Sequence, residues 1–522
     1  MTDQRPSSAK RRIEHLEMCG IVKRFPGVLA NNCIDLDVHS GEIHALLGEN
    51  GAGKTTLMNI LFGLHRPDDG RVLLNGEAAR IASPSDAIQA GIGMIHQHFM
   101  LVDTLSVTEN VALGLPSSRG FMLDLDVVAE RIRELAGTYG LQVDPMAMVW
   151  QLAVGEQQRV EILKALYRGA DLLILDEPTA VLTPQEVNEL FGTLRRMAQE
   201  GHSLIFISHK LHEVLSISDR VTVLRDGRVV ETLPTSETTR DELARLMVGR
   251  DVLLRVERPP IELGDVRLSL HGVWAEGDQD VPALRDVSLA VRAGEILGIA
   301  GVSGNGQREL AEVIAGLRPP TQGQVAIDGV DVTGWPPSRL LKQGLSYIPE
   351  ERMRDGAIRD SSVAENLILR DHGSKPYANG IFMNFNKIAE HSDQLITDFD
   401  IRTPTRDTAL KNLSGGNIQK LILARELSRQ PTVLVAAQPT RGVDISATEY
   451  IHQLLVRQRT KGTATLLISE DLDEIQNLSD RIAVMYEGQI MGIVERGEAT
   501  AEQLGLMMAG VDVLGQHSAA SR

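Results

Sequence analysis

Two halves of the chain show the same alternation of apolar and polar segments. In the first half, EIHALL (residues 42–47), LLIL (172–175) and SLIFIS (203–208) are short apolar runs bounded by glycine or polar residues, which predicts buried strands. KTTLMNILFG (54–63) is a predicted helix, and DLDVVAERIRELAGTYG (124–140) carries Val128, Ile132 and Leu135 at helical spacing. Strands that alternate with helices predict an α/β fold, in which ligands bind at the carboxyl ends of the strands.

The motifs that punctuate this pattern occur twice. GENGAGKT (48–55) recurs as GVSGNGQR (301–308), an offset of 301 − 48 = 253, and the same offset places Gln97 opposite Glu350. LAVGEQQ (152–158) matches LSGGNIQ (413–419) at an offset of 413 − 152 = 261. That second offset also relates LDEPT (175–179) to AAQPT (436–440), and His209 to Glu470. Two constant registers that differ by eight predict a duplication with a single net insertion, which falls in a helical part between Glu350 and Leu413.

The repeat predicts two large domains and short flanking segments. We expect a disordered tail over residues 1–12, a first domain over 13–250, a linker over 251–264, a second domain over 265–513 and a tail over 514–522. Pro259 and Pro260 favour the linker assignment because proline ends regular structure.

Composition narrows the class of protein. A net charge of −17 argues against a nucleic-acid partner, since a surface that follows phosphates needs an excess of Lys and Arg. No apolar run approaches the roughly 18–20 residues of a membrane-spanning helix, and the polar N-terminus does not resemble a signal peptide. The two cysteines have no metal or redox spacing, which favours reduced thiols in the cytoplasm. We therefore expect a cytoplasmic protein that reaches membranes only through partners.

GENGAGKT fits the phosphate-binding pattern G-x-x-x-x-G-K-[ST], with a predicted strand before it and a helix after it. Its glycines let backbone N–H groups curl around phosphate oxygens, and the helix N-terminus adds a favourable dipole. Lys54 is expected to reach the β- and γ-phosphates, and the Thr55 hydroxyl to ligate Mg²⁺. The predicted nucleotide contacts are Gly48, Glu49, Asn50, Gly51, Ala52, Gly53, Lys54, Thr55 and Thr56.

Four further residues of the first half are candidates for ATP hydrolysis. Asp176 ends an apolar strand and is expected to hold the metal, while the adjacent Glu177 orients or deprotonates the attacking water. His209 follows the next strand, where a γ-phosphate contact is expected, although a lone histidine is more often structural. Gln97 either bridges metal and water or is a polar loop residue.

LSGGN and LAVGE, together with the phosphate loop, LDEPT and His209, resemble the ATP-binding cassette (ABC) family over almost the entire chain. The resemblance implies two tandem P-loop NTPase domains, each with a RecA-like core, an antiparallel β portion and a helical subdomain. In that family two cassettes stack head to tail, so that each ATP lies between one phosphate loop and the other signature motif. By resemblance, the signature contacts are Ser414, Gly415, Gly416 and Asn417. Phe25 in KRFPG either stacks on adenine or belongs to the core.

Under head-to-tail pairing, all the sequence departures fall on one of the two sites. In the second half Gln307, Arg308, Ala437, Gln438 and Glu470 replace the phosphate lysine, the metal hydroxyl, the metal aspartate, the catalytic glutamate and the histidine. The first signature has Ala153 in place of serine, and Thr183 stands where the second half has Asp444. We expect the first phosphate loop with the second signature to hydrolyse ATP, and the other site to be inactive. Nucleotide binding at the inactive site stays open, since Arg308 keeps a positive charge.

Within the family the chain is most similar to the single-chain ATPases of carbohydrate-type importers, and IHQHFML (95–101) and LVAAQPTRGVD (434–444) look most like the nucleoside-uptake subgroup. The resemblance implies ATP and Mg²⁺ as ligands, two integral-membrane permease subunits, an extracytoplasmic solute-binding protein and one copy per transporter. It places the chain at the cytoplasmic face of the inner membrane, without nucleic acid. The alternatives are an importer of sugars such as ribose or galactose, a soluble twin-cassette ATPase acting on the ribosome or DNA, and a regulatory ATP sensor.

Overall fold

The computed structural model describes residues 12–96, 99–115, 124–179, 182, 184–208, 210–250, 257–278 and 281–513. Contacts between residues divide the chain into two compact units, Met1–Val252 and Leu253–Arg522. Gln97, His209 and Thr183 lie outside the described residues, as do most of the predicted tails and residues 251–256 of the predicted linker.

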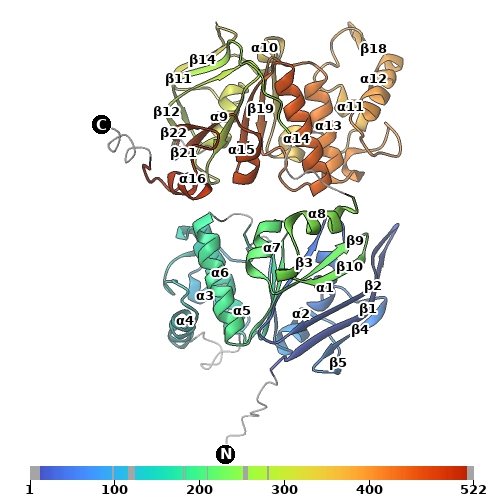
Figure 1. Cartoon of the computed structure of the whole chain (residues 1–522), viewed down its shortest axis with the longest axis vertical. Helices are drawn as coiled ribbons and strands as arrows, with labels where there is room; N and C mark the ends of the chain where they lie inside the picture. The colour runs from blue at the N-terminus through green and yellow to red at the C-terminus, as the bar shows by residue number, and fades with distance from the viewer. Residues whose placement is uncertain are drawn as a thin grey trace, which may run out of the picture. The chain divides into compact units, whose positions relative to one another are not determined.

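Two sheets form the framework of the first unit (Figure 1). The antiparallel sheet has the order β2-β1-β4-β5 and contains β1 (His15–Phe25), β2 (Val28–His39), β4 (Asp69–Leu74) and β5 (Glu77–Ala79). The six-stranded sheet has the order β10-β9-β3-β8-β7-β6 and contains β3 (Ile43–Gly48), β6 (Ile92–Ile95), β7 (Leu172–Asp176), β8 (Ser203–Ile207), β9 (Arg220–Arg225) and β10 (Arg228–Pro234). All its strands are parallel to their neighbours except β10, which is antiparallel to β9.

The predicted strands are confirmed to within one residue at each end. Every residue of β3, β7 and β8 is buried, because helices or the other sheet cover both faces of the parallel sheet. This two-sided burial explains why these strands appear in the sequence as unbroken apolar runs. A core that includes Leu46, Leu57 and Ile174 joins the six-stranded sheet to the antiparallel one.

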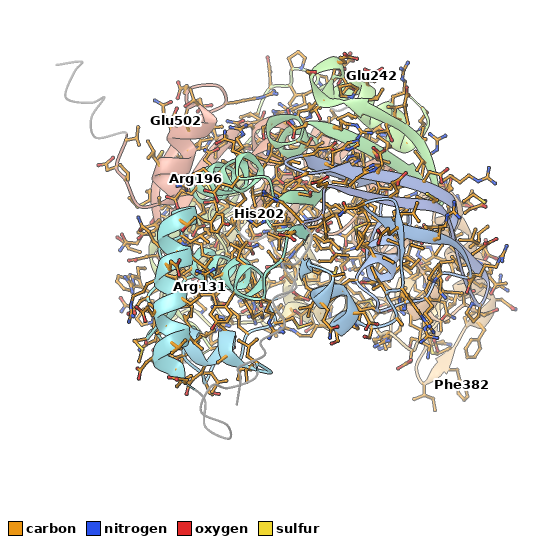
Figure 2. The ribbon with its side chains drawn as sticks, turned by 90° about the horizontal axis from the view of Figure 1, so that it is seen from below. Arg131, Arg196, His202, Glu242, Phe382 and Glu502 are labelled. Atoms are coloured by element: carbon orange, nitrogen blue, oxygen red, sulfur yellow. The ribbon has the colours of Figure 1, made fainter. Side chains whose placement is uncertain are left out.

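The described residues of the first unit form the helices α1 (Lys54–Leu61), α2 (Pro84–Gln89), α3 (Val107–Ala112), α4 (Leu125–Tyr139), α5 (Val154–Tyr167), α6 (Pro184–Gln199), α7 (Leu211–Ile217) and α8 (Arg240–Val248), with short 3₁₀ turns η1 (Val149–Gln151) and η2 (Thr235–Glu237). Helices α3, α4 and α5 pack on one another and form the predicted helical subdomain. The Tyr139 hydroxyl at the end of α4 lies 2.8 Å from Nε2 of His202, which follows α6. Figure 2 labels Arg131 on α4 and His202.

The second unit repeats this topology. Its two larger sheets have the orders β12-β11-β14-β15 and β16-β19-β20-β13-β21-β22, and β17 pairs with β18 in a separate hairpin. Its strands are β11 (Val266–Glu276), β12 (Pro282–Arg292), β13 (Ile296–Ala300), β14 (Gln322–Ile327), β15 (Val330–Asp331), β16 (Leu345–Ile348), β17 (Ala378–Asn379), β18 (Phe382–Met383), β19 (Val433–Ala437), β20 (Ala464–Ser469), β21 (Arg481–Tyr486) and β22 (Gln489–Glu495). Its helices are α9 (Gln307–Ile314), α10 (Pro337–Lys342), α11 (Val363–Leu367), α12 (Phe385–Asp398), α13 (Gly415–Leu427), α14 (Ile445–Thr460), α15 (Leu472–Leu478) and α16 (Ala501–Met508), with the turns η3 (Arg352–Gly356) and η4 (Leu410–Asn412).

The net insertion of eight residues in the second half is spread over more than one place. The caps of α3 and α11, Ser106 and Ser362, differ by 362 − 106 = 256, whereas the caps of α4 and α12, Asp124 and Asn384, differ by 384 − 124 = 260. Part of the extra length therefore precedes α11, and part lies between α11 and α12, the segment that contains the β17–β18 hairpin. Phe382 of this hairpin is exposed and is labelled in Figure 2.

Two segments near the predicted domain ends make specific contacts. Arg12 donates to the carbonyl oxygen of Glu200 in the first unit. Arg258 donates to the carbonyl oxygen of Ser479 at 2.8 Å and forms an ion pair with Asp480, which attaches residues 257–264 to the second unit. In the described part of the chain, no helix combines the length and apolarity that crossing a membrane requires.

Candidate nucleotide-binding site

The phosphate loop of the first unit connects β3 to α1. Gly53 caps α1 with φ 98°, and a Cβ atom there would lie 2.4 Å from the carbonyl oxygen of Ala30, so only glycine fits. Asn31, fully buried on β2, donates from Nδ2 to the Gly53 carbonyl oxygen at 3.0 Å and holds the loop against the antiparallel sheet. Asn50, Gly51 and Thr55 are exposed, Glu49 and Thr56 are half-buried, and Ala52 is buried.

The ammonium group of Lys54 lies over this loop. Its Nζ donates to the carbonyl oxygens of Gly48 at 2.7 Å and Glu49 at 3.0 Å, and the side chain is buried. Burial lowers the pKa of Lys54, while the negative charges of Glu177, Asp176 and Glu49 act in the opposite direction. The lysine is thus brought together with both predicted carboxylates.

Asp176 and Glu177 stand at the carboxyl end of β7. The pKa of Asp176 is raised to about 6, first by burial and then by the charge of Glu177, against the opposing effect of Lys54. A carboxyl group in this environment gains from a bound cation, which offsets the cost of its buried charge. Glu177 has φ 48°, and its backbone N–H donates to the Ile207 carbonyl oxygen at 2.9 Å, so the turn is fixed to β8.

Phe25 is not a core residue. It is the last residue of β1 and is 38% exposed, with its ring edge-to-face against His65 at a centroid distance of 5.5 Å. An exposed aromatic ring is available to stack on a base. The role of Phe25 at adenine remains a prediction.

A buried carboxylate that sequence reasoning did not identify connects the two strand ends of the site. Glu213 of α7 accepts hydrogen bonds from Thr179 Oγ1 at 2.6 Å and from Ser208 Oγ at 3.1 Å. Its second oxygen forms an ion pair with Lys210 at 3.1 Å. Since Thr179 follows Glu177 and Ser208 precedes His209, Glu213 fixes the backbone on both sides of the predicted catalytic groups.

The second unit keeps the backbone of this site and changes its side chains. Gln307 donates from Nε2 to the Val302 carbonyl oxygen at 2.9 Å, which is the position of Glu49 in the first loop. Arg308, which replaces Thr55, forms ion pairs with Glu312 at 2.8 Å and Asp278 at 3.3 Å. The guanidinium group is therefore engaged by carboxylates of its own unit.

The turn after β19 has the same geometry as the turn after β7. Gln438 has φ 48°, and its backbone N–H donates to the Ile468 carbonyl oxygen at 2.8 Å. Ala437 and Gln438 nevertheless offer no carboxylate to a metal or to water. Glu470 follows β20, and Glu350, opposite Gln97, forms an ion pair with Arg441.

Both signature motifs begin a helix. Ser414 caps α13, with its Oγ accepting from the Asn417 backbone N–H at 3.5 Å and from Asn417 Nδ2 at 2.9 Å. Ser414 and Gly415 are exposed, whereas Gly416 is buried. In the first unit Ala153 takes the cap position of α5 and has no hydroxyl. Asp444 caps α14 and accepts from the Ala447 N–H at 2.7 Å.

A groove of about 260 Å³ lies beside the end of β6, and the sequence did not predict its lining residues. Apolar walls from Phe62, Met94 and Met100 meet charged groups of Glu161 and Arg168. Glu161 accepts from the Met100 backbone N–H at 2.7 Å, and its other oxygen forms an ion pair with Lys164 at 2.8 Å. The groove adjoins the segment that leads to Gln97.

Comparison with known proteins identifies the class that this fold and site define. The family model described as "ABC transporter" matches residues 31–180 and again residues 284–441, which is more than half of the chain. The chain belongs to the ABC transporter family. It is an ATP-binding ATPase with two tandem cassettes, as the sequence predicted.

Three relatives are similar over nearly their whole length. The chain is 51% identical to the glucose import ATP-binding protein TsgD13 of Haloferax volcanii, over 95% of this chain and 96% of the relative. It is 46% identical to the nucleoside import ATP-binding protein NupA of Lactococcus lactis, over 95% and 98%. It is 47% identical to the guanosine import ATP-binding protein NupO of Bacillus subtilis, over 95% and 97%.

Proposed function

We propose that this chain powers nucleoside import by hydrolysing ATP at one competent site. The observation that carries the proposal is the asymmetry between the two units. In the first unit, Lys54, Asp176 and Glu177 interact electrostatically. In the second unit, the corresponding positions hold Gln307, Ala437 and Gln438, which carry no charge. Chemistry that needs a lysine, a metal carboxylate and a base is available in the first unit only.

The competent site takes its remaining groups from the second signature motif, in the head-to-tail arrangement that the family resemblance implies. In this proposal Ser414 and the N–H of Gly416 contact the γ-phosphate held by Lys54. Thr55, Gln97 and Asp176 hold Mg²⁺, and Phe25 stacks on adenine. Mg²⁺ supplies charge neutralisation of the β- and γ-phosphates. Glu177 orients and deprotonates water, and His209 contacts the γ-phosphate.

The partners follow from the same proposal. Two integral-membrane permease subunits each insert a cytoplasmic coupling helix, and the groove of Phe62, Met94 and Met100 has the apolar walls and charged rim that suit an amphipathic helix. A solute-binding protein delivers the substrate on the other side of the membrane. The chain is peripheral at the cytoplasmic face, with one copy per transporter and the domain boundaries at about residues 250 and 265.

Nucleosides are proposed ahead of sugars on two grounds. Relatives named for nucleoside and guanosine import match 95% of the chain at 46% and 47% identity. The monosaccharide subgroup, by family resemblance, more often retains the acidic pair where this chain has Ala437 and Gln438. Sugar import is the second candidate, and the 51% identity to a glucose import protein favours it.

Uptake in cells that also express the cognate permeases separates the two. Labelled guanosine, uridine, ribose and glucose are offered to cells with the wild-type chain or with Glu177→Gln. We expect nucleoside uptake that is lost in the variant. Sugar uptake alone moves the chain to the second candidate. An absence of all uptake, with ATP hydrolysis intact, contradicts the import proposal and favours a soluble twin-cassette ATPase.

A further inference from the structure

Two histidines and two carboxylates lie on one face of the paired strands β1 and β2. His15 is opposite His39, and Glu17 is opposite Asp37, so the four side chains form two adjacent cross-strand pairs. The imidazole rings of His15 and His39 are stacked, with centroids 4.5 Å apart and planes 4° from parallel. One ligand atom from each of His15, Asp37 and His39 lies within 4.8 Å of the other two.

This spacing is close to that of ligands around one ion. Donor atoms about 2.1 Å from a tetrahedral ion are about 3.4 Å apart, so binding would draw the three atoms closer together and tilt the two parallel rings toward a common centre. His39 Nε2 and Asp37 Oδ2 are already 3.2 Å apart. The side chains are part-exposed, at 32% for His15 and 42% for Asp37.

The surroundings of His15 favour an unprotonated Nε2, whose lone pair can bind a metal. Its Nδ1 lies 3.7 Å from Glu17 Oε2, and a carboxylate beside this nitrogen favours the tautomer that carries the proton on Nδ1. Its Nε2 is buried and has no hydrogen-bond partner among the described residues. Buried polar atoms in proteins are nearly always paired, and a metal ion would satisfy this one.

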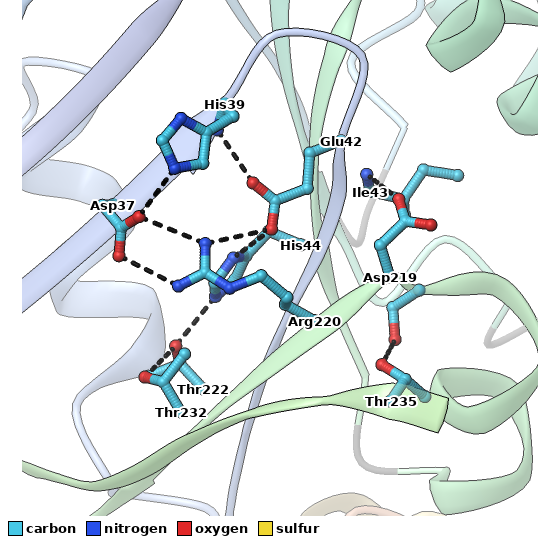
Figure 3. Close-up of polar contacts among 11 residues, drawn as sticks. Asp37, His39, Glu42, Ile43, His44, Asp219, Arg220, Thr222, Thr232 and Thr235 are labelled. Atoms are coloured by element: carbon cyan, nitrogen blue, oxygen red, sulfur yellow. Dashed lines mark hydrogen bonds and ion pairs between the residues drawn. The ribbon is translucent and has the colours of Figure 1, made fainter. Parts of the chain in front are cut away.

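Arg220 holds Asp37 in place by donating hydrogen bonds to both of its carboxylate oxygens (Figure 3). Its two terminal nitrogens each lie 3.1 Å from one oxygen of Asp37, and one of them is 3.3 Å from Glu42. Hydrogen bonding to Arg220 is the main cause that lowers the pKa of Asp37, against the effect of burial. Arg220 can remain on Oδ1 while Oδ2 turns from Arg220 and His39 Nε2 to an ion. Such outer contacts orient the ligands of metal sites.

The second unit shows that the fold does not require this cluster. Leu16 opposite Val38 in the first unit corresponds to Leu268 opposite Val291 in the second. This register places Arg267, Ser269, Ala290 and Arg292 at the positions of His15, Glu17, Asp37 and His39. The ion pair of Arg220 with Glu42 is kept as Arg481 with Glu295, at 2.7 Å. The arginine–glutamate pair is therefore a shared structural element, and the histidines are an addition to the first unit.

We propose that His15, Asp37 and His39 bind one divalent transition-metal ion of the Zn²⁺ type on the β1–β2 ladder, with Glu17 orienting His15. Two imidazoles and a carboxylate are ligands that zinc prefers, and a mainly imidazole set does not suit Mg²⁺. The site is on the antiparallel sheet and separate from the phosphate loop. A bound ion would cross-link β1 to β2 and stabilise this sheet.

The test uses the full-length chain without a histidine tag, freed of metal with a chelator. Zn²⁺ is titrated by calorimetry and Co²⁺ by visible absorption in the presence of excess Mg²⁺. We expect one Zn²⁺ or Co²⁺ per chain, with the intense visible bands of four-coordinate Co²⁺. His15→Asn and His39→Asn are each expected to weaken binding more than about tenfold, since even the loss of an outer contact costs 10- to 100-fold.

The matched control is His271→Asn, an exposed histidine on β11 of the second unit, which is expected to bind as the wild type does. Thermal unfolding without metal shows whether each variant is folded, and Zn²⁺ is expected to raise the melting temperature of the wild type and of His271→Asn only. Unchanged stoichiometric binding in the His15→Asn, His39→Asn double variant, or no binding by the folded wild type, overturns the proposal.

Discussion

Gln438 takes the same backbone position after β19 that Glu177 takes after β7. Both residues have φ 48°, and each donates its N–H to the neighbouring strand, at 2.8 Å to Ile468 and at 2.9 Å to Ile207. The two turns therefore differ in side-chain chemistry and not in shape. The carboxylate of Glu177 can act as a general base, whereas the amide of Gln438 cannot.

Glu177→Gln copies the second unit's side chain into the first. Because the turn already accommodates glutamine, we expect the variant to fold and to bind ATP normally. We expect ATP turnover to fall by about 10²- to 10⁴-fold, the usual contribution of a general base. Phosphate release under saturating ATP is the measurement. Turnover equal to that of the wild type would remove Glu177 from the catalytic role.

The reverse change, Gln438→Glu, is the control. A carboxylate at position 438 would still lack its companions, because the second unit has Ala437 where the first has the metal aspartate, and Gln307 where the first has the phosphate lysine. The double variant Glu177→Gln, Gln438→Glu is therefore expected to stay inactive.

Lys54→Gln copies the phosphate loop of the second unit. Gln307 keeps a hydrogen bond to the carbonyl oxygen of Val302, so glutamine at position 54 is expected to leave the loop folded. The lost charge-assisted contacts to phosphate are expected to weaken ATP binding by about 10- to 100-fold. Binding of a fluorescent ATP analogue to the Glu177→Gln background measures this effect without turnover.

Its matched control is Gln307→Lys, which adds a cation where Arg308 is held by Glu312 and Asp278. We expect no loss of ATP affinity at the first loop. An equal loss of ATP affinity in both variants would show that Lys54 is not what makes the first loop the one that binds ATP.

Ser414→Arg tests the head-to-tail proposal. An arginine at this exposed cap is expected to block the approach of the second signature to ATP and to abolish hydrolysis at the first phosphate loop. Loss of the Ser414 cap on α13 is expected to cost about 1 kcal/mol of stability, too little to unfold the second unit. ATP turnover and a melting curve are the two measurements.

The corresponding change in the first signature, Ala153→Arg, lies at the site that we propose is inactive. We expect it to leave turnover within about twofold of the wild type. If Ser414→Arg hydrolyses ATP normally, or if Ala153→Arg is the damaging variant, the assignment of the signatures is wrong.

Much of the candidate site could be predicted because each of its motifs lies within a short stretch of sequence. A strand, a glycine loop and a helix follow one another within residues 43–61, and Asp176 simply ends an apolar run. Each motif carries its own structural context, so Lys54 and Asp176 needed no tertiary information. The structure adds that their charges act on one another.

Other features depend on contacts between distant segments and leave no local pattern. Glu213 lies in the first turn of a helix, where a glutamate usually indicates a solvent-facing side, yet its partner Thr179 is 34 residues away. The contact of Arg308 with Asp278 joins residues 30 positions apart. The His15–His39 pair depends on the register of β1 and β2, which contains bulges that the sequence does not reveal.

Glu213→Gln removes one charge from the network that fixes both strand ends. We expect lower stability by about 1–3 kcal/mol, because Thr179, Ser208 and Lys210 lose a buried charged acceptor. We also expect kcat to fall while KM for ATP changes little, since the strand ends lie beside the catalytic groups rather than the phosphate loop. Steady-state ATP hydrolysis and thermal unfolding measure the two effects.

Glu474→Gln is the matched variant in the second unit, where Glu474 accepts from Thr440 at 2.9 Å and contacts His452 at 2.9 Å. We expect a similar loss of stability without the fall in kcat. A fall in kcat of the same size in both variants would show that Glu213 acts only through general stability.

Asp176→Asn is expected to reveal the raised pKa of this carboxyl group through its pH dependence. The pKa of Asp176 is about 6 in the folded chain, compared with 3.8 for an ordinary aspartate, and burial is the first cause. Between these values the unfolded chain has lost the proton that the folded chain retains, so the wild type loses stability as pH rises from 3.8 to 6. The full loss is about 3 kcal/mol, at 1.36 kcal/mol per pKa unit.

Asparagine cannot ionise, so the melting temperature of Asp176→Asn minus that of the wild type is expected to increase from pH 4 to about pH 6 and then to level off. The measurement is made without nucleotide and with chelator. Asp86→Asn, in the same unit, is the sign control: the backbone N–H of Ala82 lowers the pKa of Asp86, so its contribution is lost as pH falls. A difference for Asp176→Asn that is constant across this range would show that the folded chain does not retain the proton.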